Sequence, residues 1–313
     1  MDAMTTTSEL RDALSRVRLE VGKAVVGQDG AVTGLLIALL ANGHVLLEGV
    51  PGVAKTLLVR TLSRSLSLET RRVQFTPDLM PGDITGSVVY DPKTGEFEFR
   101  EGPVFTNILL ADEINRTPPK TQSALLEAME ERQVSADGVT RALPVPFLVA
   151  ATQNPIEYEG TYTLPEAQLD RFLLKLVLDL PARDAEVEVL VRHASGFNPR
   201  DLEAAGVTPV LDAATLQAAQ ADVARMPVSA DVLGYAVDLA RGTRQSPSVR
   251  LGVSPRGTTA LLAASRAWAW LSGAAGVTPT TSRRWRFPCC GTVSSCGPRR
   301  SSRASARMRC CAP

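Results

Sequence analysis

The segment from Gly49 to Thr56, which reads GVPGVAKT, constrains the fold more than any other part of this 313-residue chain. The apolar run 44–48 before it predicts a buried strand, and residues 57–66 after it predict a helix. A glycine-containing loop between a strand and a helix N-terminus lets backbone N–H groups converge on phosphate oxygens. The segment therefore predicts a phosphate cradle in a parallel α/β sheet, and a plain Gly-Pro turn is the simpler alternative.

Two side chains of this loop carry specific chemistry. Lys55 is predicted to reach the β- and γ-phosphates of a nucleoside triphosphate, and Thr56 to ligate Mg²⁺. Ala54 stands where the strict pattern G-x-x-x-x-G-K-[ST] has its second glycine. A methyl group is acceptable there if the residue has helical backbone angles.

Strands and helices alternate up to Pro181. We expect strands at 44–48, 72–75, 107–111, 147–151 and 172–180, hairpins at 87–105 and 134–141, and helices at 8–24, 31–41, 57–66 and 121–131. Such alternation predicts a parallel sheet flanked by helices. Only helices are expected afterwards, at 184–195, 212–224, 229–242 and 255–272. The chain is thus predicted to hold an α/β domain, 1–181, and a smaller all-α domain, 182–278.

Two carboxylates follow the apolar strand 107–111. Asp112 is predicted to hold Mg²⁺ through its waters, and Glu113 to orient and polarise the water that attacks a phosphate. An Asp-Glu pair alone usually marks the exposed end of a strand. Its position after a phosphate loop favours the catalytic interpretation.

Three further polar residues are candidates with open alternatives. Asn154 follows the strand 147–151, where it could bind the γ-phosphate or the water, or could merely form a turn with Pro155. Arg171 could be an arginine finger for a neighbouring subunit, or could pair with Asp170. Arg256 lies at the start of a predicted helix, where a cation opposes the helix dipole. A nucleotide phosphate could justify it, and a solvated arginine is the alternative.

Composition and hydropathy indicate the class of protein and its expected location. Hydrophobic residues are 44% and charged residues 21%, which is ordinary for a globular protein. No apolar run approaches the roughly 20 residues that cross a bilayer, and no secretory signal is visible, so a cytoplasmic location is expected.

The last 35 residues, 279–313, differ from the rest. They hold eight Arg, no Asp or Glu, and all five Cys: Cys289, Cys290, Cys296, Cys310 and Cys311. Removing those eight from 34 Lys and Arg leaves 26 against 33 acids, so residues 1–278 carry −7, which disfavours nucleic-acid binding. We expect this aberrant tail to be disordered and to result from a frameshift, because a one-base shift of a GC-rich back-translation yields an amphipathic helical segment. A zinc site or a basic nucleic-acid arm are alternatives, and the cysteine spacing suits zinc poorly.

Taken in order, these motifs resemble the MoxR family of AAA+ ATPases over about residues 8–278. The resemblance rests on the phosphate loop and on three further segments: ADEINR at 111–116, ATQNP at 151–155 and LPEAQLDRF at 164–172. Ala54 in the phosphate loop is what this family tends to carry. The implied fold is an AAA+ α/β domain with a β-hairpin insertion and a helical lid, which the tail would leave incomplete.

The resemblance implies a role for each candidate residue. Gly49, Val50, Pro51, Gly52, Val53, Ala54, Lys55 and Thr56 match Walker A, Asp112 and Glu113 match Walker B, Asn154 matches sensor 1, Arg171 the arginine finger, Arg256 sensor 2, and Val26, Gly27 and Gln28 the adenine pocket. It also implies ATP and Mg²⁺ as ligands, a ring hexamer, and a chaperone-like motor that remodels a protein partner, often one with a von Willebrand A domain. The alternatives are a nucleotide-binding scaffold without turnover, because of the tail, and a nucleic-acid motor.

Overall fold

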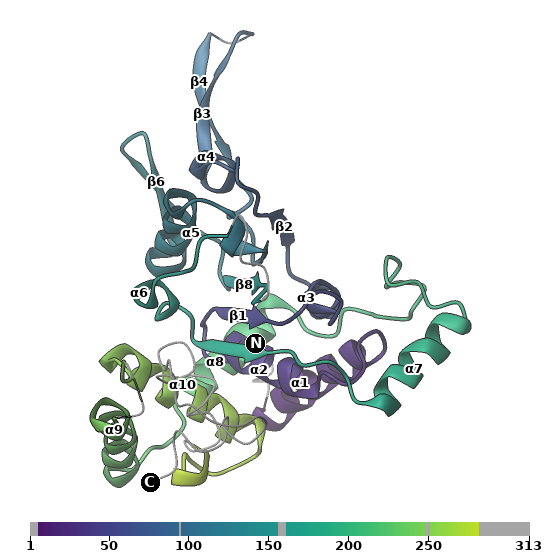
Figure 1. The fold of residues 1–313 in the computed structure, drawn as a ribbon, viewed down its shortest axis with the longest axis vertical. Helices are drawn as coiled ribbons and strands as arrows, with labels where there is room; N and C mark the ends of the chain where they lie inside the picture. The colour runs from purple at the N-terminus through teal and green to yellow at the C-terminus, as the bar shows by residue number, and fades with distance from the viewer. Residues whose placement is uncertain (1–5, 94, 156–160, 248, 250, 282–313) are drawn as a thin grey trace.

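Five parallel strands form the centre of the computed structural model, which describes residues 6–93, 95–155, 161–247, 249 and 251–281 (Figure 1). The strands are β1 (Val45–Glu48), β2 (Thr70–Gln74), β5 (Ile108–Asp112), β8 (Leu148–Gln153) and β9 (Leu174–Val177), in the order β2-β5-β8-β1-β9. The sequence-based prediction of a parallel α/β sheet is confirmed. Strand β9 is shorter than the predicted 172–180.

Alternation along these strands divides the core between the two faces of the sheet. Val45, Leu47 and Leu110 belong to one buried cluster, whereas Leu46 and Leu109 belong to the other. Successive side chains of a strand point to opposite faces, so apolar residues at nearly every position bury both faces. The three central strands β1, β5 and β8 therefore lie inside the molecule, whereas the edge strands β2 and β9 keep exposed residues.

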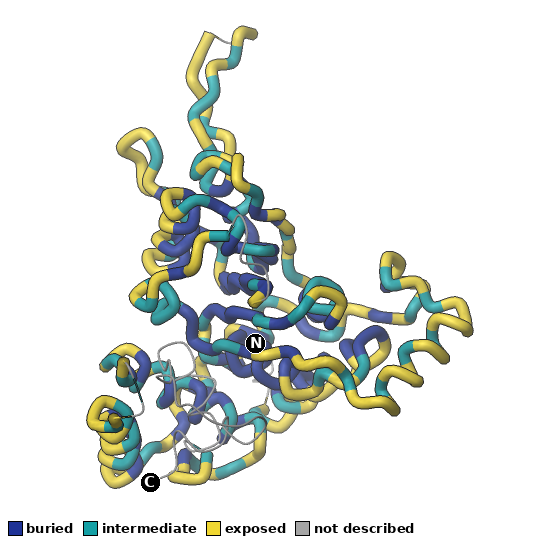
Figure 2. Tube along the Cα trace, in the orientation of Figure 1, coloured by how far each residue is buried: buried dark blue, intermediate teal, exposed yellow. Residues whose placement is uncertain are grey.

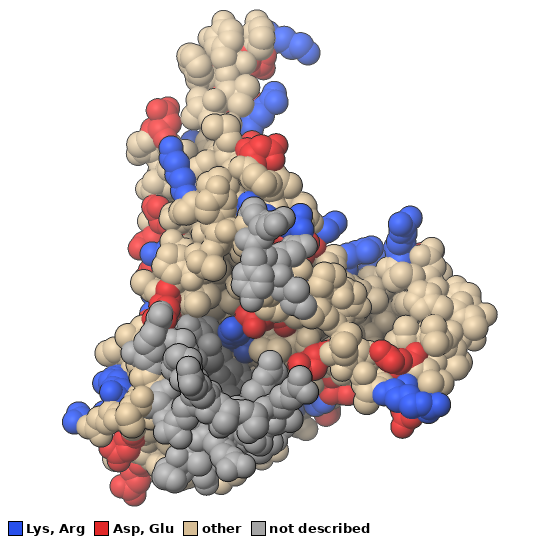
Figure 3. Space-filling model, viewed as in Figure 1, with Lys and Arg blue, Asp and Glu red and all other residues tan. Residues whose placement is uncertain are grey.

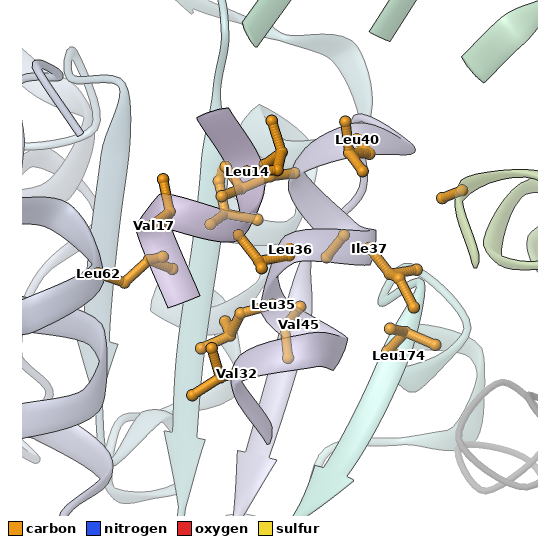
Figure 4. Packing of buried hydrophobic residues seen from close by; sticks show 14 of the residues in the cluster. Leu14, Val17, Val32, Leu35, Leu36, Ile37, Leu40, Val45, Leu62 and Leu174 are labelled. Atoms are coloured by element: carbon orange, nitrogen blue, oxygen red, sulfur yellow. The ribbon is translucent and has the colours of Figure 1, made fainter. Parts of the chain in front are cut away.

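Helices α1 (Thr7–Gly22), α2 (Asp29–Leu40) and α3 (Lys55–Ser65) cover the first face. Helix α1 begins at a capping box between Thr6 and Glu9 and buries one apolar stripe, whereas α2 is buried at every position from Ala31 to Leu40. Figure 4 shows side chains of α1, α2 and α3 meeting those of β1 and β9. A helix that is apolar on all sides needs such a covered position.

The second face is covered by α5 (Pro119–Glu131) with smaller elements around it. These are α4 (Pro81–Thr85), the 3₁₀ turn η1 (Ile114–Arg116), α6 (Glu166–Leu169), and two hairpins, β3 (Gly86–Asp91) with β4 (Glu96–Glu101) and β6 (Gln133–Ala136) with β7 (Val139–Ala142). The β3–β4 hairpin projects far from the sheet, and most of it is exposed (Figures 1 and 2).

The remaining helices are α7 (Arg183–Ala194), α8 (Ala213–Ala224), α9 (Ala230–Gln245) and α10 (Pro255–Leu271). Helix α7 extends away from the body and has no buried residue (Figure 2). Helices α8 and α10 instead pack with α1 and α2 in one apolar cluster, which includes Leu216 and Trp270. The hydrophobic core thus continues across the predicted domain boundary at 181. The tail hypotheses concern residues that, from 282 onward, lie outside the described part of the chain.

No helix in the described part of the chain has the length and apolar character needed to cross a membrane. On the face drawn in Figure 3, Lys and Arg are interspersed with Asp and Glu among the described residues.

His44 is buried just before β1 and links three elements. Its Nδ1 accepts the Val149 N–H at 3.0 Å, which leaves Nε2 as the donor to the Met129 carbonyl at 3.0 Å. Both ring nitrogens are therefore used by a neutral imidazole. Burial lowers the pKa of His44 from 6.5 to about 4, with smaller opposing and supporting effects from Met129, Arg132 and Arg256.

We predict that this histidine makes folding stability depend on pH. Because its folded pKa lies below its unfolded pKa, the unfolded chain takes up a proton first, and stability falls as the pH drops through 6.5 toward 4. Between pH 7 and pH 5 the expected loss in the free energy of unfolding is about 2 kcal/mol. Urea denaturation at several pH values measures it. His44→Gln should flatten the dependence, His193→Gln on exposed α7 should not, and an unchanged slope in His44→Gln would contradict the assignment.

Candidate active site at the carboxyl ends of the strands

The phosphate loop connects the end of β1 to the start of α3. The Gly49 N–H donates to the Gln153 carbonyl at 3.3 Å, and a Cβ on Gly49 would lie 2.7 Å from the Leu178 carbonyl oxygen, so only glycine fits. Gly52 has a φ of +88° with open space beside it. Lys55 donates from Nζ to the Gly49 carbonyl and to the Val50 carbonyl at 3.4 Å, which places its ammonium over the loop. A tight glycine turn with a lysine ammonium beside it is compatible with the phosphate-binding role predicted for this loop.

Ala54 does not have the right-handed helical backbone angles under which a methyl group is easily accepted. Its φ is 63° and its ψ is 25°, in the left-handed region, immediately before α3 begins at Lys55. This conformation costs a residue with a Cβ about 1 kcal/mol. The condition stated from the sequence is therefore not met, because the chain reverses direction at this residue before the helix begins.

Asp112 ends β5 and is only 6% exposed. Its Oδ2 accepts the Thr56 hydroxyl at 3.1 Å and the Arg72 guanidinium at 2.7 Å, while its Oδ1 accepts the Thr152 hydroxyl at 2.5 Å. Hydroxyl and carboxylate oxygens that converge beside a phosphate cradle are the ligands Mg²⁺ prefers. The pair Thr56 and Asp112 therefore fits the metal role predicted for it.

Glu113 turns sharply away from the strand. Its φ is 58°, and its N–H donates to the Thr152 hydroxyl at 2.9 Å. The carboxylate accepts a hydrogen bond from Gln74 at 2.7 Å and pairs with Arg116 at 3.1 Å. The left-handed backbone and these contacts hold the carboxylate at the carboxyl edge of the sheet.

Asn154 is 4% exposed and lies one residue beyond β8. In the sheet order, β8 stands between β5, which carries Asp112, and β1, which leads into the phosphate loop. The topology therefore brings Asn154 between the loop and the carboxylates.

Residues 26–28 lie beside the connection to α7. A Cβ on Gly27 would lie 3.1 Å from the Ala185 Cβ, and the Gln28 amide donates to the Asp179 carbonyl at 3.2 Å. Gly27 and Gln28 thus lie against the chain that enters the helical region. Its predicted role in binding adenine stays a prediction.

Arg171 and Arg256 lie at the opposite end of the sheet. Arg171 precedes β9, whose first residue Leu174 pairs with Val45, the first residue of β1. The phosphate loop follows the last residue of β1, and a strand of four residues spans about 13 Å. The two arginines therefore do not join the loop, Asp112 and Glu113 within one chain.

One carboxylate holds both arginines. Glu130, near the end of α5, pairs with Arg171 at 2.9 Å and with Arg256 at 2.8 Å. Asp170, which we considered as a partner of Arg171, instead accepts the Ser254 hydroxyl at 2.7 Å. Glu130 explains how a cation is accommodated at the start of α10.

Comparison with known proteins identifies the family of this chain. A family model for the ATPase family associated with various cellular activities (AAA) matches residues 44–174, and an AAA lid domain model matches residues 241–284. Protein MoxR of Methylorubrum extorquens is 37% identical over 87% of this chain and 84% of its own length. Chaperone MoxR1 of Mycobacterium tuberculosis is 45% identical over 85% of this chain and 71% of its own.

The chain belongs to the MoxR family of AAA+ ATPases.

A further relative and a solved structure support this family assignment. YeaC of Bacillus subtilis is 49% identical over 86% of this chain and 82% of its own length. A solved structure from Cytophaga hutchinsonii, assigned as an ATPase, superposes with a TM-score of 0.84 at 38% identity, covering 93% of this chain and 89% of that one. The expected MoxR resemblance and the expected AAA+ fold with a helical lid are confirmed.

Several residues that contact the predicted site residues were not predicted from the sequence. Arg72 and Gln74 contact the two carboxylates, Thr152 contacts Asp112, and Glu130 holds the two arginines. Arg72 and Gln74 stand two positions apart on a strand, a spacing that puts both on one face and could have drawn attention to them. The sequence offers no comparable signal for Glu130, which lies 41 and 126 positions from its partners.

The left-handed backbone of Ala54 makes a testable prediction for stability. Ala54→Gly should raise the free energy of unfolding by up to about 1 kcal/mol, and Ala54→Val should lower it by more than about 1 kcal/mol. Chemical denaturation measures both. Ala218→Gly, at an exposed position inside α8, provides a control of opposite sign with a loss of about 1 kcal/mol. A Val variant as stable as the wild type would contradict the left-handed assignment.

Proposed function

We propose that this chain binds Mg²⁺·ATP at the carboxyl edge of the sheet and hydrolyses it to ADP and phosphate. The observation that carries the proposal is the 3.1 Å contact between the Thr56 hydroxyl and Asp112 Oδ2, which joins the phosphate loop to the acidic strand end. A loop and a strand 56 positions apart in sequence thereby form one site for a phosphate and its metal.

Each residue of the site has a distinct task. The loop N–H groups and Lys55 bind the β- and γ-phosphates, and Thr56 and Asp112 hold Mg²⁺, which neutralises charge that develops on the phosphates. Glu113 orients and polarises the attacking water, and Asn154 donates to the γ-phosphate or to that water. Because the Glu113 carboxylate already contacts Gln74 and Arg116, it must release at least one of them to hold a water.

Arg171 and Arg256 act on the nucleotide of a neighbouring subunit. Their position at the amino end of the strands supports this, since the phosphate loop of the same chain lies at the other end. A heterologous interface between the two ends repeats from subunit to subunit and closes a ring. Such a ring has an arginine pair at every nucleotide, and we propose six subunits from the family resemblance.

The cycle of ATP binding and hydrolysis remodels a protein partner. The relative from Mycobacterium tuberculosis is named a chaperone, which supports this assignment. From the family resemblance we propose a partner with a von Willebrand A domain.

Two substitutions separate binding from turnover. Glu113→Gln should retain ATP affinity and lose about 100-fold or more in turnover, because the amide cannot polarise the water. Lys55→Ala should lose ATP binding itself. Fluorescent ATP titration and phosphate release measure the two effects. Wild-type turnover by Glu113→Gln would remove this residue from the mechanism, and no binding by the wild type would refute the proposal as a whole.

A mixing experiment tests whether the arginines act between subunits. Glu113→Gln and Arg171→Ala proteins should each be inactive, yet their mixture should recover turnover at about a quarter of the sites when equal amounts combine at random. In those sites an intact Glu113 meets an intact Arg171 from its neighbour. The same result is expected with Arg256→Ala. A mixture of Glu113→Gln with Lys55→Ala is the control and should stay inactive, and inactivity of the arginine mixtures would show that both residues act within one chain.

A further inference from the structure

Asp112 already has a cation beside it within its own chain. Arg72 donates to Asp112 Oδ2 from Nη2 at 2.7 Å and from Nε at 3.1 Å, so two of its N–H groups converge on one oxygen. This is the same oxygen that the Thr56 hydroxyl contacts. The guanidinium therefore stands on the side of Asp112 that faces the phosphate loop, where the metal of the proposed site belongs.

The burial of Asp112 explains why a cation is needed there. Its side chain is 8% exposed, and a buried carboxylate is costly unless it is paired and hydrogen-bonded. Thr152 and Thr56 supply hydrogen bonds but no charge. Arg72 supplies one positive charge, and Mg²⁺ would supply two, so the two cations compete for Asp112.

The Arg72 side chain also has space to move away from Asp112. Its side chain is 52% exposed and lines a cavity of about 830 Å³ between α3, β2 and residues 200–209. Asp201 lines this cavity and offers a carboxylate to the guanidinium, whereas Glu203 is already paired with Arg64 at 2.8 Å. Arg60, Arg64 and Arg200 line the cavity as well and repel the guanidinium. The arginine surplus keeps Arg72 on Asp112 until a stronger cation replaces it.

Gln74 steadies Arg72 in this position. The Gln74 side-chain oxygen accepts from Arg72 Nη2 at 2.9 Å, so the guanidinium is fixed from two sides. Arg71, the preceding residue, pairs with Glu69 and does not share these contacts.

We propose that Arg72 is a displaceable counter-ion of Asp112, which Mg²⁺ must replace when the nucleotide binds, so that Arg72 sets the Mg²⁺ concentration at which nucleotide loads. The inference rests on the proposed Mg²⁺·ATP site. Removing the guanidinium leaves Asp112 without its own cation and therefore makes it a better metal ligand.

The test measures binding of a fluorescent, non-hydrolysable ATP analogue at increasing Mg²⁺ in the full-length chain. In Arg72→Gln the Mg²⁺ midpoint should fall about threefold or more, the factor expected for a half-exposed ion pair. Arg72→Lys should lie between wild type and Arg72→Gln, since its ammonium makes a single contact. Arg71→Gln removes the same charge from the neighbouring position and should leave the midpoint unchanged.

Thermal unfolding gives a second readout. Without nucleotide, Arg72→Gln should lower the melting temperature by about 2 °C or more, because Asp112 is left as a buried, uncompensated charge. With Mg²⁺ and the analogue at saturation, the difference from wild type should disappear.

Two results would overturn the inference. One is a Mg²⁺ midpoint in Arg72→Gln that equals that of Arg71→Gln. The other is weaker binding of the analogue at saturating Mg²⁺, which would make Arg72 a phosphate ligand instead. Failure of the wild type to bind the analogue at any Mg²⁺ concentration would instead refute the proposed function, so the two failures are distinguishable.

Discussion

The parallel pairing of β1 between β8 and β9 is the constraint on which the rest of the structure depends. It buries a strand on both faces and leaves only its two ends for function. At the carboxyl end, the phosphate loop follows Glu48, and the neighbouring strands deliver Asn154, Asp112 and Glu113 to the same edge. The chemistry of the site is therefore a consequence of strand order, because parallel strands place their carboxyl ends together.

The amino end of the same strands has a different character. There His44 joins β1, β8 and the end of α5, and Glu130 on α5 pairs with Arg171 and Arg256. In the proposed function one end of the sheet receives a phosphate, and the other carries two guanidiniums that pair with Glu130 within the chain. In the proposed ring, the amino end of one subunit meets the carboxyl end of the next.

The buried charge of Asp112 connects the candidate site to strand β2. A carboxylate that holds a metal carries a negative charge, yet Asp112 is almost fully buried, and an unpaired buried carboxylate would destabilise the fold. Arg72 resolves this conflict within the chain. The same strand that supplies Arg72 also supplies Gln74, which contacts Glu113, so β2 touches both acids although it contributes none of the residues that the phosphate-loop motif contains.

The sequence by itself determined the local chemistry and most of the elements. The phosphate loop, the acidic strand end and the apolar periods could be recognised because each depends on residues close in sequence, and the bounds of α10 and β5 agree with the structure within a few residues. The conformation of Ala54 could not be predicted from the sequence, because the left-handed angle follows from how the loop turns between a fixed strand and a fixed helix. Tertiary structure alone decided the partners: Arg72 on Asp112, Gln74 on Glu113, and Glu130 between Arg171 and Arg256. These pairs join residues from 39 to 126 positions apart, and a pairing at that separation depends on which strands and helices pack together, which no local pattern encodes.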